Sequence, residues 1–166
     1  MKNEDMINSI EEYWRPSDER CGRLIQKQGW VTHYSVALSS HTAMAWGGVE
    51  LGSKGCLVTH DIGPEFSDTQ WVMHLPLDDI KRNLLGSVAA FHNETWLYSL
   101  IGWNCEHWAR LVTTGEPICY QVRDFFPFNI FIGGQHWRGE AIPHLAAHVG
   151  ILANSDKGFQ KGRPSG

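Results

Sequence analysis

Hydrophobic and polar side chains alternate along the first half of the chain as they do in β-strands. Residues 31–38 read VTHYSVAL, so the large apolar side chains fall on one face and small ones, together with His33, fall on the other. Strand-like patterns also cover residues 43–51, 56–60 and 70–75. The first half of the chain is therefore predicted to form a sheet.

The spacing of the apolar positions changes after Pro76, and most of the predicted helices follow it. Apolar residues recur there every three or four positions, which is typical of a helix with one buried face. Helices are predicted over residues 5–14, 79–91, 104 to about 113, and 121–126. Strands that precede helices indicate an α+β domain with an antiparallel sheet.

The overall composition fits one globular domain. The chain has 166 residues, of which 42% are hydrophobic and 19% are charged, so it can bury a core and is not expected to be disordered. A net charge of −4 leaves no basic surface of the kind that binds nucleic acid, and no nucleic-acid partner is expected.

The cysteines and the N-terminal segment predict a cytoplasmic protein. The four cysteines form no C-x-x-C pair and no cluster, which favours reduced thiols. The first residues are acidic and lack the apolar run of a signal peptide. No stretch reaches the roughly 18 consecutive apolar residues that a membrane-spanning helix needs.

A zinc site is the alternative raised by three histidines near the C-terminus. His144 and His148 are four residues apart, and His136 lies upstream of them. Neither an H-E-x-x-H motif nor a cysteine pair accompanies these histidines, so an ordinary surface or core position is favoured. No metal ion and no cofactor are expected.

The segment around Cys105 carries the best candidate for chemistry. Asn104 is a good helix N-cap, so Cys105 is expected in the first turn of a helix. Free backbone N–H groups and the positive end of the helix dipole stabilise a thiolate at that place and are expected to lower the pKa of the thiol. The competing interpretation is a buried, inert structural cysteine. His107, two residues further on, is expected to have a structural role, with a hydrogen bond to a backbone carbonyl.

A thiol nucleophile needs a base, and His33 is the candidate. Its small neighbours Ser35 and Ala37 share its strand face and would let the helix that bears Cys105 approach the sheet closely. The backbone N–H of Cys105 is the expected donor to an oxyanion. The competing interpretation of His33 is a half-buried histidine bonded to a neighbouring strand.

A known family shares this arrangement of motifs. The segment NCEHW at 104–108, Gly115 and the pair QV at 121–122 resemble the lecithin:retinol acyltransferase family. Its small phospholipase and acyltransferase members carry N-C-E-H-F, followed at similar spacing by a glycine and Q-V. The pair HY at 33–34 resembles the H-[WY] pair of the family's catalytic-histidine strand. The resemblance covers roughly residues 30–124.

The resemblance implies a fold and an activity. The fold is circularly permuted and papain-like, of the NlpC/P60 type, with an antiparallel sheet packed on the helix that bears Cys105. The activity is that of a thiol-dependent acyltransferase or phospholipase-like hydrolase, in which Cys105 takes an acyl group from a lipid ester and passes it to water, an amine or an alcohol. His33 is then the base, and peripheral contact with a membrane is expected.

Three segments follow from this interpretation. Residues 1–29 are an N-terminal extension with a short helix, and residues 30–127 form the thiol domain. Residues 128–166 form a C-terminal extension whose tail is polar from about residue 155.

The chain departs from the family at one position of consequence. A second histidine late in the next strand usually orients the first, but that place falls near Ala45 or Trp46 here. His41 and His60 are the two candidates to replace it. The missing second histidine supports one alternative, a catalytically weak binding module. The other alternative is a cysteine peptidase or amidase of the same fold group, because the same Cys/His geometry serves amides.

Overall fold

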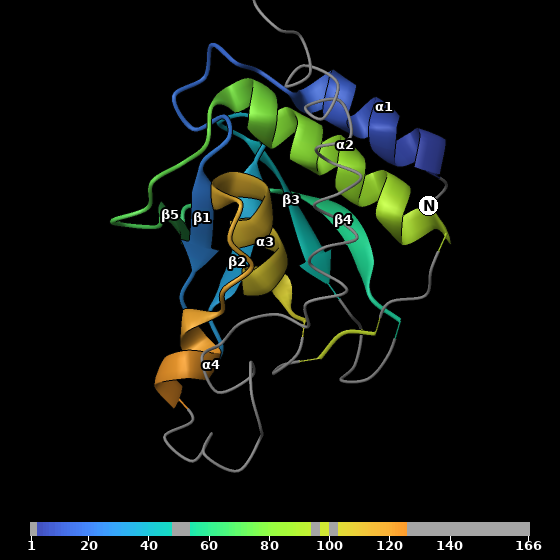
Figure 1. Cartoon of the computed structure of the whole chain (residues 1–166). Coiled ribbons are helices and arrows are strands. Elements are labelled where there is room, and N and C mark those ends of the chain that lie inside the picture. Colours follow the sequence, from blue (N-terminus) through green and yellow to red (C-terminus); the bar gives the residue numbers. More distant parts are fainter. Residues whose placement is uncertain (1–2, 48–53, 94–96, 100–102, 126–166) are drawn as a thin grey trace, which may run out of the picture.

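The computed structural model of the chain describes residues 3–47, 54–93, 97–99 and 103–125. Figure 1 shows the order of their helices and strands, which runs as follows: α1 (Asn3–Tyr13), β1 (Leu24–Lys27), β2 (His33–Ala37), β3 (Thr42–Gly47), β4 (Cys56–Asp61), β5 (Phe66–Asp68), α2 (Leu77–Asn93), α3 (Cys105–Thr114) and α4 (Tyr120–Phe125). The described part of the chain is therefore a mixed α+β structure, as predicted.

The strands form one antiparallel sheet with the order β4-β3-β2-β1-β5. The predicted strands over 31–38, 43–51 and 56–60 correspond to β2, β3 and β4, although residues 48–51 lie outside the described residues. The antiparallel sheet is thus confirmed.

The sheet is strongly curled. Strands β4 and β5 form its opposite edges, yet the ring of His60 in β4 stacks on the ring of Phe66 in β5, with 5.1 Å between the ring centroids. The inner face combines Ile25 and Phe66 with small side chains, of which Ser35, Ala37 and Ala43 are completely buried. Larger side chains at these three positions would keep the strands from closing so tightly, so the small residues allow the sheet to curl.

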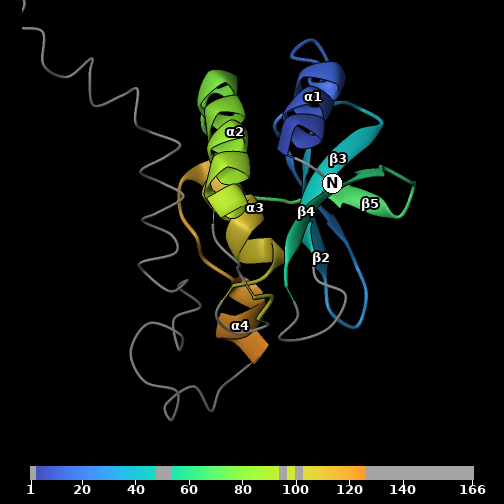
Figure 2. The ribbon, with the colours of Figure 1, turned by 90° about the vertical axis from the view of Figure 1, so that its right-hand side faces the viewer.

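The outer face of the sheet carries the main core. Tyr34, Val36 and Leu38 belong to the same buried cluster as Trp108 and Val112 of α3. Figure 2 shows α2 and α3 together on one side of the strands. The prediction that the small face of β2 meets the Cys105 helix is therefore wrong. The small face lines the inside of the curl, and the large apolar face packs against α3.

Residues 3–27, which the sequence assigns to an extension, contribute to the same core and sheet. Met6 and Ile10 of α1 are buried in the main cluster. Strand β1 pairs with β2 on one side and with β5 on the other. The segment 128–166 lies outside the described residues.

Residues 70–75 do not form the predicted strand. After β5, the backbone N–H of Thr69 donates to the carbonyl oxygen of Leu24, and the chain then leaves the sheet. Trp71 has a φ of 58° and is fully exposed, whereas His74 accepts a hydrogen bond from the backbone N–H of Leu24 at 3.0 Å. The alternating pattern therefore reflects an extended loop with one covered side.

The helices agree more closely with the sequence pattern. The predicted helices 5–14, 79–91, 104–113 and 121–126 correspond to α1, α2, α3 and α4. Within the described residues, no helix combines the length and the apolar character needed to cross a bilayer.

Candidate active site

The N-terminus of α3 is capped as the sequence predicts, and more completely. The side-chain oxygen of Asn104 accepts hydrogen bonds from the backbone N–H groups of Glu106 at 3.0 Å and His107 at 3.1 Å. In return, Nδ1 of His107 accepts the backbone N–H of Asn104 at 3.2 Å, which completes a capping box. His107 thus has a structural role, as expected, but its ring accepts a backbone N–H where a bond to a backbone carbonyl was predicted.

Cys105 is the first residue of α3, and its side chain is buried, with 2% of its surface exposed. The hydroxyl of Tyr98 donates to Sγ at 3.8 Å, and this contact and the backbone of Tyr34 both lower the pKa of the thiol. Burial nevertheless raises the pKa of the thiol by more than these contacts lower it. The predicted lowering of the Cys105 pKa is therefore wrong, because removal from water outweighs the helix terminus.

The sulfur of Cys105 lies near the part of β2 that no longer pairs with β3. Among the described residues, β3 pairs with β2 at Val36 and Ala37 and no longer does so at Tyr34. The N-terminus of α3 reaches the β2 backbone at that point. The residue of β2 whose backbone lowers the pKa of Cys105 is therefore the one directly after His33.

His33 begins β2, and its side chain lies half-buried on the inner side of the sheet. Its ring centroid is 5.9 Å from that of His60, and Lys27 is its partner across β1. Burial lowers the pKa of His33, and the nearby His60 and Lys27 lower it further. His33 is therefore a neutral imidazole near pH 7. Within the described residues, no hydrogen bond joins this ring to Cys105.

Of the two candidates for an orienting group, His60 lies beside His33. Its Nδ1 is 2.9 Å from the carbonyl oxygen of Asp61, so this nitrogen carries the proton. Its Nε2 then accepts the hydroxyl of Ser35 at 2.8 Å. Both nitrogens are thus engaged, and neither is left to orient His33. His41 is exposed in the turn at the opposite end of β2.

A buried carboxylate directly follows Cys105. Glu106 is completely buried, and its Oε1 pairs with Nε of Arg110 at 2.8 Å. Its Oε2 accepts the Cys119 thiol at 3.1 Å and the backbone N–H of Gln121 at 3.2 Å. From the sequence, Glu106 is recognisable only as an acidic residue in the first turn of a helix, and this buried role was not predicted. The fixed spacing between N-C-E-H and Q-V was the signal that pointed to it.

Metal binding finds no support among the described residues, which contain no group of three or more side chains suited to hold an ion. His136, His144 and His148, the basis of the zinc alternative, lie outside the described residues.

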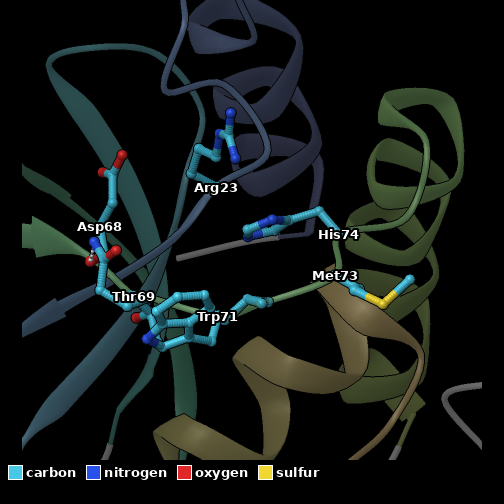
Figure 3. A pocket seen from close by; sticks show the side chains of 8 residues that line it. Arg23, Asp68, Thr69, Trp71, Met73 and His74 are labelled. Carbon is cyan, nitrogen blue, oxygen red and sulfur yellow. Dashed lines mark hydrogen bonds between the residues drawn. The ribbon is translucent and has the colours of Figure 1, made fainter.

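Two hollows flank the loop over residues 71–74. One measures about 440 Å³ and includes Arg23, Asp68 and His74 in its lining, as Figure 3 shows. The other measures about 450 Å³ and lies toward Arg110 and Tyr120. Cys105 lines neither of them.

The state of His33 predicts how the stability of the fold depends on pH. An unfolded histidine titrates near pH 6.5, whereas folded His33 titrates lower. Between these two values the unfolded chain binds the extra proton, so the free energy of unfolding should fall as the pH drops below about 6.5. Urea unfolding between pH 7.5 and 5 measures this slope. His33→Gln should make it shallower, although His74, whose pKa is also lowered by burial, contributes a slope of its own. Equal slopes in both proteins would contradict the assignment.

Comparisons of the chain with protein-family models, with curated proteins and with solved structures found no match.

Proposed function

We propose that the chain is a thiol-dependent acyltransferase or phospholipase-like hydrolase, with Cys105 as nucleophile and His33 as base. The observation that carries the proposal is the contact between the N-terminus of α3 and β2. The backbone of Tyr34, the neighbour of His33, is close enough to Cys105 to lower the pKa of its thiol. The N-C-E-H segment and the downstream Q-V pair support the same interpretation. The curled antiparallel sheet with α3 on its outer face is compatible with the papain-like fold proposed for the chain.

The charges of the two groups define the form of the reaction. Burial raises the pKa of Cys105 and lowers that of His33, so the resting pair is a thiol and a neutral imidazole. The proposed reaction requires the His33 ring, which lies beside His60 on the inner side of the sheet, to come within hydrogen-bond reach of the sulfur. The thiol proton then passes to His33 as the sulfur attacks the ester carbonyl, and the backbone N–H of Cys105 donates to the oxyanion. The protonated His33 then gives its proton to the leaving alcohol, and a Cys105 thioester remains. Water, an amine or an alcohol accepts the acyl group.

A lipid acyl ester is the proposed substrate because of the motif resemblance, and this choice is an argument by analogy. Peripheral contact with a membrane surface is proposed with it, since a phospholipid substrate lies at such a surface.

The second candidate is a binding module that has lost activity. The burial of Cys105 and its raised pKa favour it, because a reactive thiol is normally exposed and acidic. The engaged nitrogens of His60 favour it as well, since no second histidine in the described part of the chain orients His33.

The test combines turnover with trapping of the thioester. The full chain is mixed with vesicles of phosphatidylcholine and, separately, with a p-nitrophenyl acyl ester, and adducts are mapped by mass spectrometry. The proposal expects ester turnover and an acyl adduct on Cys105 that hydroxylamine removes. Cys105→Ala should lower turnover by about 10³-fold or more. Cys56→Ala alters an exposed cysteine and should leave ester turnover unchanged. Absence of both turnover and adduct would favour the binding module.

A further inference from the structure

Helix α4 is attached to the chain just before β2 by one side chain. The side-chain oxygen of Gln121 accepts the backbone N–H of Thr32 at 2.8 Å, and its Nε2 donates to the carbonyl oxygen of Thr32 at 2.9 Å. One carboxamide thus satisfies both backbone groups of one residue, as a neighbouring strand would. Figure 1 shows α4 next to this end of β2.

The same residue is also tied to the N-terminus of α3. The backbone N–H of Gln121 donates to Oε2 of Glu106 at 3.2 Å, and the ion pair with Arg110 holds that carboxylate. Glu106 directly follows Cys105 in the chain. A continuous path of hydrogen bonds therefore leads from the start of α3, through Gln121, to the residue before His33.

The His33 end of β2 has few other supports. Pairing with β3 stops at Val36, and the pairing of β2 with β1 ends at the His33–Lys27 pair. On the other side of Thr32, Trp30 and Val31 are exposed and add little packing. The two hydrogen bonds from Gln121 hold the backbone of Thr32, as a neighbouring strand would in the middle of a sheet.

We infer that Gln121 is a positioning residue that sets the place of His33 relative to Cys105. The inference rests on the proposed function, in which His33 takes the proton of the Cys105 thiol. Proton transfer needs near-hydrogen-bond distance, and a displacement of about 1 Å can cost on the order of 100-fold in rate. The two hydrogen bonds between the Gln121 side chain and the Thr32 backbone are called the clamp below. Loss of the clamp should lower kcat and should affect substrate binding less.

The variants separate the clamp from the general integrity of α4. Gln121→Met keeps the length of the side chain and removes both hydrogen bonds. Gln121→Glu keeps an acceptor for the Thr32 N–H but places a carboxylate against the Thr32 carbonyl. Arg123→Gln is the matched control, because Arg123 lies exposed on the same helix and pairs only with its neighbour Asp124 among the charged groups described.

The expected result is a 10- to 100-fold lower kcat for Gln121→Met, with KM changed less than threefold, and an intermediate value for Gln121→Glu. Arg123→Gln should match the wild type. By NMR, Gln121→Met should shift the His33 ring resonances and speed amide exchange at Thr32. A loss of kcat no larger than the loss of folded protein, or unmoved His33 and Thr32 signals, would overturn the inference.

The NMR measurements also separate this inference from the proposed function. If the wild-type chain turns over no ester, the proposed function fails. The His33 shifts and the Thr32 exchange still report whether Gln121 places β2. If turnover exists and depends on Cys105 but Gln121→Met leaves kcat and these signals unchanged, only the inference fails.

Discussion

Replacing Arg110 with methionine is expected to lower the free energy of unfolding by about 3–5 kcal/mol. The reason is the carboxylate of Glu106, which is completely buried and has its ion-pair partner 2.8 Å away. Methionine keeps much of the apolar stem of the arginine and removes the charge. The remaining carboxylate would be buried without its cation, which costs far more than the loss of an exposed ion pair.

Denaturation in guanidinium chloride measures this effect, and two variants make it specific. Arg123→Met removes an exposed ion pair with Asp124 and should cost only about 0–1 kcal/mol. Arg110→Met combined with Glu106→Gln removes both charges and should recover part of the loss, because no unpaired charge stays buried. A cost for Arg110→Met that equals the cost for Arg123→Met would show that the Glu106–Arg110 ion pair contributes no more than an exposed one.

The sequence pattern predicted the strands with one apolar and one small or polar face, and it missed the short strand β1. Leu24 and Ile25 are adjacent in β1 and both completely buried, one on each side of the curled sheet. A strand covered on both faces shows no alternation, so its period cannot be recognised. The loop over residues 70–75 is the reverse case. Its apolar and polar residues alternate because one side of the loop is covered by the protein, although the loop does not pair with a strand.

The local part of the candidate site was predictable, and the tertiary part was not. Asn104 is a cap because of its own side chain and the residues that follow it, so the position of Cys105 at a helix start follows from the sequence. Which face of β2 meets α3 depends on how the whole sheet curls. The pKa of Cys105 depends on burial by several elements, and the engagement of His60 depends on the path of β4.

The order in which the four cysteines react is the sharpest consequence of the burial around α3. Cys56 is exposed, whereas Cys21, Cys105 and Cys119 are buried. Burial raises the pKa of Cys21 to about 11, and it raises those of Cys105 and Cys119 as well. At pH 8, a thiol whose pKa is about 11, as for Cys21, holds roughly 200-fold less thiolate than a free thiol with a pKa of about 8.5.

Iodoacetamide at pH 8, followed by mass spectrometry of the peptides, is therefore expected to label Cys56 first and Cys105 much more slowly, because Cys105 is buried and its pKa is raised. The four rates should converge in guanidinium chloride, and Cys56→Ser should remove the fast phase without exposing the others. Faster labelling of Cys105 than of Cys56 below pH 7, lost in His33→Ala, would instead reveal a thiolate–imidazolium pair. Slow labelling together with an acyl adduct from an ester would mean that the thiol gives up its proton only as it attacks the substrate, which is the reaction that a neutral Cys105 and a neutral His33 permit.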